Sequence, residues 1–253
     1  MPRDRDNPMK RRFADLHLQP NLSDTQQTKS IIAKASELGY RLVAVPLPIA
    51  AMDSFAKKLA AACQENKLDF ASRLDLKPKT SKELLQQLRK FRRKAEVIAV
   101  VCESKEVARQ AAKDHRVDLL NFPAVDPHRR FFDKAEAELA SSSVAALEID
   151  IKPLLTLKGS ARIRLLAALR RETAIAKDYH VPIAISSGAT SPLYMRKPLE
   201  MAALASLFDL DKPTALNAVS KTPLTIVERN REKLSPNFVA PGIRIIRKGS
   251  DCP

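Results

Sequence analysis

Short apolar runs alternate with longer amphipathic segments over most of this chain. The runs fall at residues 13–17, 42–47, 68–76, 97–102, 118–122, 144–151 and 182–187. The run from Val97 to Cys102 is continuous and rich in β-branched residues, which is typical of a strand buried on both faces. Regular alternation of this kind predicts parallel strands that are joined by helical crossovers.

Segments with helical spacing of apolar residues separate these runs. We expect helices at 24–39, 53–64, 81–94, 104–115, 132–140 and 160–179, and three more at 199–207, 213–219 and 223–234. Asp24 is placed to cap the first helix and Gly39 to end it. The last three segments begin near prolines, which suit the first turn of a helix.

Either an open doubly wound sheet or a closed barrel satisfies seven strand–helix units. The chain has 253 residues and lacks a linker long enough to separate two domains. We therefore expect one TIM-like parallel (β/α) barrel of about seven strands, spanning residues 13–240. A basic N-terminal extension, 1–12, and a basic C-terminal tail, 241–253, would flank it and are expected to be mobile.

Glycine and cysteine usage exclude several classes of protein. None of the five glycines forms GxGxxG or a Walker A loop, which excludes Rossmann and P-loop nucleotide sites of those types. The three cysteines form no CxxC pair, so we expect no disulfide framework and a cytoplasmic location. The longest apolar run, 42–52, contains two prolines and is too short to span a bilayer, so no membrane association is expected.

The charge balance points to a polyanionic partner. Lys and Arg number 44 against 29 for Asp and Glu, a formal net charge of +15. Aromatic residues make up only 5% and do not interleave with the basic runs, which favours phosphate and shape contacts to folded RNA over base stacking. One basic helix face alone is commonly just solvated surface, but here several basic groups occur together.

The cations expected to bind RNA follow strand ends or lie at the end of the helix at 81–94. They are Arg73, Arg89, Lys90, Arg92, Arg93, Arg129, Arg130, Lys152, Arg196 and Lys197.

Two pairs of polar residues could begin a metal or acid/base site. Asp15 and His17 share one strand face, and Glu148 and Asp150 have the same i, i+2 spacing on the sixth strand. A hydrolytic metal centre needs three or more ligands, commonly with several histidines, and this chain has only four histidines. We therefore expect no metal site and no cofactor on the protein. Serine catalysis is also not expected, because Ser186–Gly188 lacks the GxSxG pattern.

A series of short motifs carries a resemblance to a known family. The motifs are Phe13–Leu18, Ala146–Ile151, Ile185–Ala189, Arg196–Pro198, Ile226–Arg231 and Pro241–Ile246. In this order they resemble the archaeal ribonuclease P protein component 3 family, the counterpart of the thirty-kilodalton subunit of eukaryotic ribonuclease P. The resemblance runs from about residue 13 to residue 247, nearly the whole chain.

The resemblance implies a TIM-like barrel related to the polymerase-and-histidinol-phosphatase hydrolases. Those enzymes begin with His-x-His on the first strand, whereas here Gln19 stands at the second position. The resemblance thus implies that the metal centre was lost, and that the polar residues at the barrel mouth are vestigial. These residues are Asp15, His17, Glu148 and Asp150.

The resemblance also implies a function in tRNA processing. The chain would bind the catalytic RNA of ribonuclease P and support removal of the 5′ leader from precursor tRNA, with magnesium held by the RNA. The isolated chain would not be catalytic, and it would pair with ribonuclease P protein component 2 in a heterotetramer with two of each. The alternatives are a metal-dependent phosphoesterase of the polymerase-and-histidinol-phosphatase type and a barrel that only recruits proteins. The histidine shortage disfavours the first, and the charge excess disfavours the second.

Overall fold

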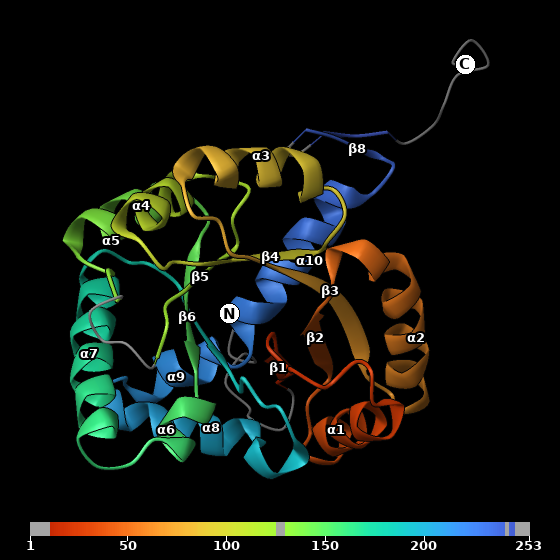
Figure 1. The fold of residues 1–253 in the computed structure, drawn as a ribbon, viewed down its shortest axis with the longest axis horizontal. Helices are drawn as coiled ribbons and strands as arrows, with labels where there is room; N and C mark the ends of the chain where they lie inside the picture. The colour runs from red at the N-terminus through yellow and green to blue at the C-terminus, as the bar shows by residue number, and fades with distance from the viewer. Residues whose placement is uncertain (1–10, 125–129, 241–242, 246–253) are drawn as a thin grey trace, which may run out of the picture.

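The computed structural model describes residues 11–124, 130–240 and 243–245. Seven parallel strands, β1 to β7, are hydrogen-bonded to one another in chain order. Helices surround them on the outside (Figure 1). Beyond the strand ends, the backbone N–H of Gln19 donates to the carbonyl of Ala189 at 2.8 Å, which links the first strand to the last. The expected TIM-like barrel of about seven strands is confirmed.

The strands coincide closely with the apolar runs. They are β1 (Ala14–Asp15), β2 (Leu42–Pro46), β3 (Asp69–Leu76), β4 (Val97–Val101), β5 (Leu119–Asn121), β6 (Ala146–Asp150) and β7 (Ile183–Ser186). β1 is shorter than the expected 13–17, because regular pairing with β2 joins only Ala14 to Leu42 and Asp15 to Val43.

The outer helices also follow the sequence pattern. They are α1 (Thr25–Glu37), α2 (Met52–Glu65), α3 (Ser81–Phe91), α4 (Lys105–Lys113), α5 (Lys134–Ser141) and α7 (Gly159–Asp178). The Asp24 carboxylate accepts from the backbone N–H of Gln27, and Gly39 ends α1 with a φ of +95°, so both expected boundary residues of α1 are confirmed.

The three helices after β7 were predicted, whereas several short elements were not. α8 (Pro198–Leu204), α9 (Lys212–Ala218) and α10 (Lys221–Leu234) follow β7, with 3₁₀ turns η4 (Pro192–Tyr194) and η5 (Ala205–Phe208). A further turn, η2 (Ile49–Ala51), precedes α2. A short helix, α6 (Lys152–Thr156), directly follows β6 in a segment to which no element was assigned, and it has Pro153 in its first turn.

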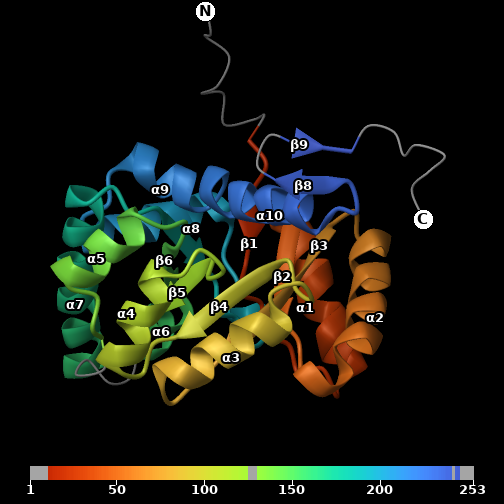
Figure 2. The same cartoon turned by 90° about the horizontal axis from the view of Figure 1, so that it is seen from above.

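Small side chains fill the middle of the barrel. Ala44, Ala71 and Ala99 pack there, and at one end Ile226 and Val227 of α10 join the same apolar cluster. Figure 2 shows α10 lying across this end of the barrel. The barrel is therefore closed at one end by α10, which leaves the end at the carboxyl termini of the strands, the mouth, for polar side chains.

Ion pairs hold α10 in this position. Arg229 donates to Asp118 at 2.8 Å, and Asn230 donates to the Glu96 carbonyl at 2.7 Å. Arg231 binds both carboxylate oxygens of Asp69, at 2.6 and 2.8 Å. All three partners precede or begin a strand, so this part of the chain fastens the helix to the amino-terminal ends of the strands.

The ends of the described chain contact this same side. Arg11 donates to Asn217 at 3.1 Å, while residues 1–10 of the expected mobile extension lie outside the described residues. β8 (Phe238–Ala240) pairs antiparallel with β9 (Ile243–Arg244), so the described residues of the expected tail add the second strand of a hairpin. Residues 246–253 lie outside the described part. No described helix is both long and apolar enough to cross a membrane.

Candidate functional site at the barrel mouth

A buried ion pair occupies the interior of the barrel just below its mouth. Arg73 comes from the middle of β3 and Glu148 from β6, and neither side chain is exposed to solvent. The guanidinium binds both carboxylate oxygens of Glu148, at 2.6 and 2.7 Å, and also donates to the Leu16 carbonyl at 2.7 Å. This planar, bidentate geometry is the strong form of an arginine–carboxylate pair.

Further polar groups complete this network. Ser186 donates to Glu148 at 2.8 Å, and the Asn121 amide donates to Glu148 at 2.9 Å and to Asp150 at 3.1 Å. Arg73 Nε donates to Asp75 at 2.6 Å. Burial raises the pKa of Asp75, but the charge of Arg73 and the contact with His17 outweigh it and lower that pKa overall.

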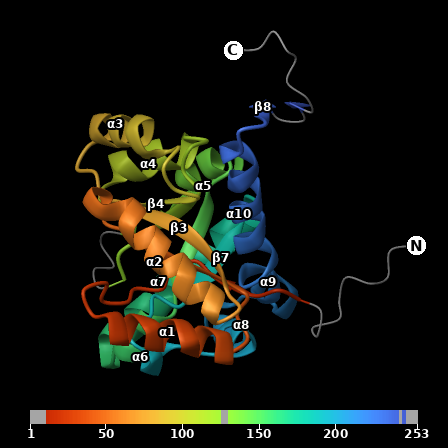
Figure 3. The same cartoon turned by 90° about the vertical axis from the view of Figure 1, so that its right-hand side faces the viewer.

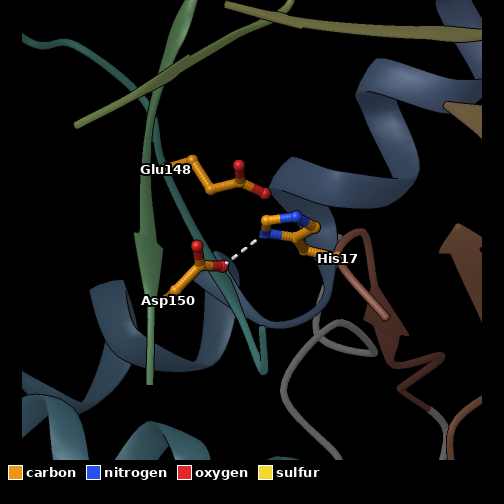
Figure 4. Close-up of side chains that lie close together, drawn as sticks. All are labelled: His17, Glu148 and Asp150. Atoms are coloured by element: carbon orange, nitrogen blue, oxygen red, sulfur yellow. Dashed lines mark hydrogen bonds and ion pairs between the residues drawn. The ribbon is translucent and has the colours of Figure 1, made fainter. Parts of the chain in front are cut away.

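His17 joins the network from the segment after β1. Figure 4 shows its ring directed toward Asp150, to which Nδ1 donates at 2.8 Å. Nε2 lies 3.3 Å from Asp75, and the Gln19 amide nitrogen lies 2.6 Å from the same Nε2. Burial and the Arg73 charge lower the pKa of His17. Asp150 and Asp75 raise it by a larger amount, so that the pKa rises overall from 6.5 to about 10. The two neighbouring carboxylates therefore favour the protonated form of the ring.

Asp15 lies outside the cluster of mouth carboxylates, although the sequence placed it on the His17 face. Its Oδ1 accepts from the backbone N–H of His17 at 3.1 Å and of Ser187 at 3.0 Å. Burial raises the pKa of this carboxyl, and the hydrogen bonds with Ser187 and His17 only partly oppose that effect. Asp15 thus joins the first strand to the loop after β7, and it offers no ligand atom to the cluster of His17, Glu148 and Asp150.

The donor set does not fit a hydrolytic metal centre. His17, Glu148 and Asp150 offer ligand atoms within 4.8 Å of one another. Both Glu148 oxygens, however, already accept from Arg73, and His17 Nδ1 donates to Asp150. A divalent cation at this position would meet the fixed positive charge of Arg73 and would find a single histidine, whereas hydrolytic centres need several free ligands. Arg73 supplies the positive charge that these carboxylates require.

Two of the cations expected to bind RNA are buried in the structure. Arg73 lies within β3 rather than after its end, and is fully buried. Arg130 is also buried and binds both carboxylate oxygens of Glu172, one of them at 2.9 Å. Their charges are therefore matched inside the protein and are unavailable to RNA in this structure. Arg129 lies outside the described residues.

The other expected cations fall at two opposite ends of the barrel. Lys152, Arg196 and Lys197 follow β6 and β7 and so lie near the mouth; only Lys197 is fully exposed. Lys152 stacks over the Tyr194 ring at 5.6 Å, and Arg196 donates to the carbonyls of Leu193 and Met195.

The cations of the third helix lie at the closed end instead. Arg92 pairs with Asp118, next to the start of β5, while the side chains of Arg89, Lys90 and Arg93 are exposed. The structure therefore does not present a single RNA-binding surface that runs directly from the mouth onto this end of the helix.

Sequence reasoning missed three members of the mouth network. Asp75 and Asn121 were not singled out, and Ser186 was considered only for serine catalysis, yet each hydrogen-bonds to Arg73, Glu148 or Asp150. One signal was available: Arg73 and Asp75 have the same i, i+2 spacing as Glu148 and Asp150 and share a strand face near the carboxyl end of β3.

Comparisons with known proteins agree on one family. The family model described as RNase P subunit p30 matches residues 12–235. The "Ribonuclease P protein component 3" of Methanosarcina barkeri is 31% identical over 234 residues, covering 92% of this chain and 95% of that protein. The protein of the same name from Methanosarcina acetivorans is 34% identical over 178 residues, covering 70% of this chain and 73% of that protein.

A solved structure shares the fold. A chain from the cryo-EM structure of archaeal ribonuclease P with mature tRNA superposes with a TM-score of 0.81 at 24% sequence identity. The match covers 94% of this chain and all of that chain. The two chains thus share one fold over nearly their whole lengths.

Proposed function

This chain belongs to the RNase P subunit p30 family, and from that membership we propose that it acts as a protein subunit of ribonuclease P. In this role it binds the catalytic RNA and supports removal of the 5′ leader from precursor tRNA. The observation that carries the proposal is the match over nearly the full length to relatives that bear this name. It supports this function over the phosphoesterase alternative.

The mouth of the barrel supports a non-catalytic role for the isolated chain. The carboxylates that a hydrolase would use to hold metal ions instead bind Arg73 and His17. We therefore expect the chemistry to reside in the RNA, with magnesium held there and no cofactor on this chain. Arg73, Glu148 and their neighbours then serve to fix the strands around the mouth.

The net charge of +15 supports binding to RNA through phosphate contacts. We further propose that the chain pairs with ribonuclease P protein component 2, with two copies of each in a heterotetramer, and that precursor tRNA is reached through the assembled enzyme. A cytoplasmic location stays a prediction.

Reconstitution tests the proposed function. The cognate ribonuclease P RNA is incubated with precursor tRNA and magnesium, with and without this chain and component 2. We expect the pair of proteins to raise cleavage above that of the RNA alone, and this chain alone to cleave nothing. Cleavage by the chain without RNA, or no effect of the chain in any mixture that contains component 2, would contradict the proposal.

A further inference from the structure

A cleft of about 580 Å³ lies at the closed end of the barrel, away from the mouth network. The end of α3, the turn after α4, the end of α10 and the hairpin strand β8 form its walls. Figure 1 shows the end of α3 near the end of α10 and β8, and Figure 3 shows β8 beyond the end of α10. We call it the α3–α10 cleft; the side chains that matter here are Arg92, Arg93, His115, Arg116, Lys233 and Phe238.

Positive charge in this cleft exceeds the negative charge near it. Arg92 is paired with Asp118, which also accepts from Arg229, and Arg116 is paired with Asp114. Arg93 and Lys233 are both exposed, and neither forms an ion pair with any residue that the structure describes. Burial, together with Arg229 and Arg92, lowers the pKa of Lys233, which is the effect expected where cations outnumber acids.

Compensation of helix dipoles explains only part of this arrangement. Cations near a helix C-terminus are favourable, and α3, α4 and α10 all end here. That effect accounts for one basic residue at each helix end. It does not account for their convergence on an open cleft with no acidic residue in its lining, where Arg229 and Arg92 repel the charge of Lys233.

We propose that the α3–α10 cleft binds a phosphodiester segment of RNA, with Arg93 and Lys233 contacting phosphates. The volume lies in the range of sites that hold small-molecule ligands, so a nucleotide unit can enter. Phe238, which is half-buried in the cleft wall, offers an apolar face to a sugar or base. This inference rests on the proposed function and specifies where the barrel binds RNA: at the closed end, not at the mouth.

The choice of RNA over an acidic protein follows from the chemistry of the lining. Four Lys or Arg side chains, no acidic side chain and one aromatic side chain line the cleft, which matches a phosphate flanked by a nucleoside. The RNA strand is either that of the ribonuclease P RNA or that of precursor tRNA, because both carry the same phosphodiester chemistry. The experiment separates these two sources.

The test compares two charge-matched variants in the reconstituted ribonucleoprotein. Arg93→Gln/Lys233→Gln removes the two unpaired cations of the cleft, and Lys29→Gln/Lys57→Gln removes two exposed lysines from α1 and α2. Affinity for the cognate ribonuclease P RNA is measured over a series of salt concentrations. Each lost phosphate contact should reduce the slope of log affinity against log salt by about 0.7 to 0.9. We expect the cleft variant to lose about 1.5 in slope and to bind about tenfold more weakly, and the control to match the wild type.

Cross-linking identifies the source of the bound strand. Lys233→Cys, labelled with a photoreactive group, is assembled with ribonuclease P RNA and precursor tRNA, and the cross-linked RNA is sequenced. We expect cross-links confined to one short segment of one of these RNAs. The control is Lys57→Cys, which should give none.

Distinct results overturn distinct claims. An unchanged salt slope for the cleft variant, with a wild type that binds RNA and supports cleavage, overturns the cleft proposal alone. The same holds if the variant keeps its RNA affinity but loses its protein partner, since the cleft would then meet an acidic protein surface. A wild type that neither binds RNA nor supports cleavage with component 2 overturns the proposed function instead.

Discussion

Arg73 binds both carboxylate oxygens of Glu148 inside the barrel, and neither side chain is exposed to solvent. The pair joins β3 to β6 across the barrel, whereas backbone hydrogen bonds join only neighbouring strands. A buried pair of this kind adds little net stability compared with apolar residues, but it is costly to break on one side only. Its role is therefore to fix which residues face one another at the mouth.

Removing one partner of this pair should be far more costly than removing both. Arg73→Met leaves Glu148 as an unpaired buried charge, and we expect it to lower the free energy of unfolding by about 3 to 5 kcal/mol. The double variant Arg73→Met/Glu148→Gln should recover a large part of that loss. Urea unfolding of Arg73→Met, Glu148→Gln and the double variant measures the coupling energy between the two residues. Additive losses would show that the two side chains do not act as a pair.

The barrel was predictable because its pattern is local. Each apolar run and the helical segment after it can be recognised without knowing which strands pair, and all seven strands lie within their predicted runs. The short β1 was less predictable, because its extent depends on pairing with β2 alone. The hairpin of β8 and β9 was missed because each strand is only two or three residues long.

The mouth network was only half predictable, for a different reason. The i, i+2 spacing of Glu148 and Asp150 correctly placed both on one face of a strand, and His17 does meet Asp150. Arg73, in contrast, was expected on the surface as an RNA contact. Its burial depends on Glu148, which is 75 residues away in the sequence. A cation in an apolar strand is ambiguous until its carboxylate partner is known.

His17 should make the stability of the protein depend on pH above neutrality. The folded pKa of about 10 is above the ordinary value of 6.5, so the folded state binds a proton that the unfolded state loses. The resulting stabilisation is fully present below pH 6.5 and is lost as pH rises through 10. Within this window the free energy of unfolding should fall by roughly 1 kcal/mol per pH unit. The measurement is urea unfolding of the wild type and His17→Gln at intervals from pH 6 to pH 10. If the difference in unfolding free energy between the wild type and His17→Gln stays constant over this range, the raised pKa of His17 is contradicted.

Gly188 should be required for the position of Asp150. It has a φ of +61°, and a Cβ added there would lie 3.1 Å from Asp150 Cβ and 3.3 Å from its Oδ1. Gly159 is a matched control, because its φ is +52° and a Cβ there meets nothing within 4 Å. We expect Gly159→Ala to cost about 1 kcal/mol from backbone strain, and Gly188→Ala to cost about 1 to 3 kcal/mol more because it also displaces Asp150. Thermal unfolding measures both, and equal losses would show that the close approach to Asp150 is unimportant.

The purified chain should hold no stoichiometric transition metal and should hydrolyse neither phosphoesters nor RNA. The physical reason is that Arg73 already neutralises the carboxylate most central to the cluster, Glu148. Elemental analysis of protein prepared without chelators, together with assays on a chromogenic phosphoester, tests this. Two or three metal ions per chain, lost in His17→Ala, would restore the phosphoesterase alternative.

The two ends of the barrel should differ in their contribution to RNA binding. At the α3 end, Arg89, Lys90 and Arg93 are exposed and free of ion pairs within the described residues. Near the mouth, Lys152 and Arg196 are half-buried, Lys152 over the Tyr194 ring and Arg196 against the Leu193 carbonyl. Two triple variants remove equal charge from each end: Arg89→Gln/Lys90→Gln/Arg93→Gln and Lys152→Gln/Arg196→Gln/Lys197→Gln.

We expect the α3 variant to reduce the slope of log affinity against log salt by about 2, and the mouth variant by less than 1, since each lost phosphate contact is worth about 0.7 to 0.9. Titration of the cognate ribonuclease P RNA between low and high salt gives both slopes, and circular dichroism confirms that both variants are folded. The wild type itself should lose roughly a thousandfold or more in affinity over one decade of salt if about five phosphates are contacted. A larger loss of slope in the mouth variant would place the RNA at the carboxyl ends of the strands, where barrels of this type usually carry their function.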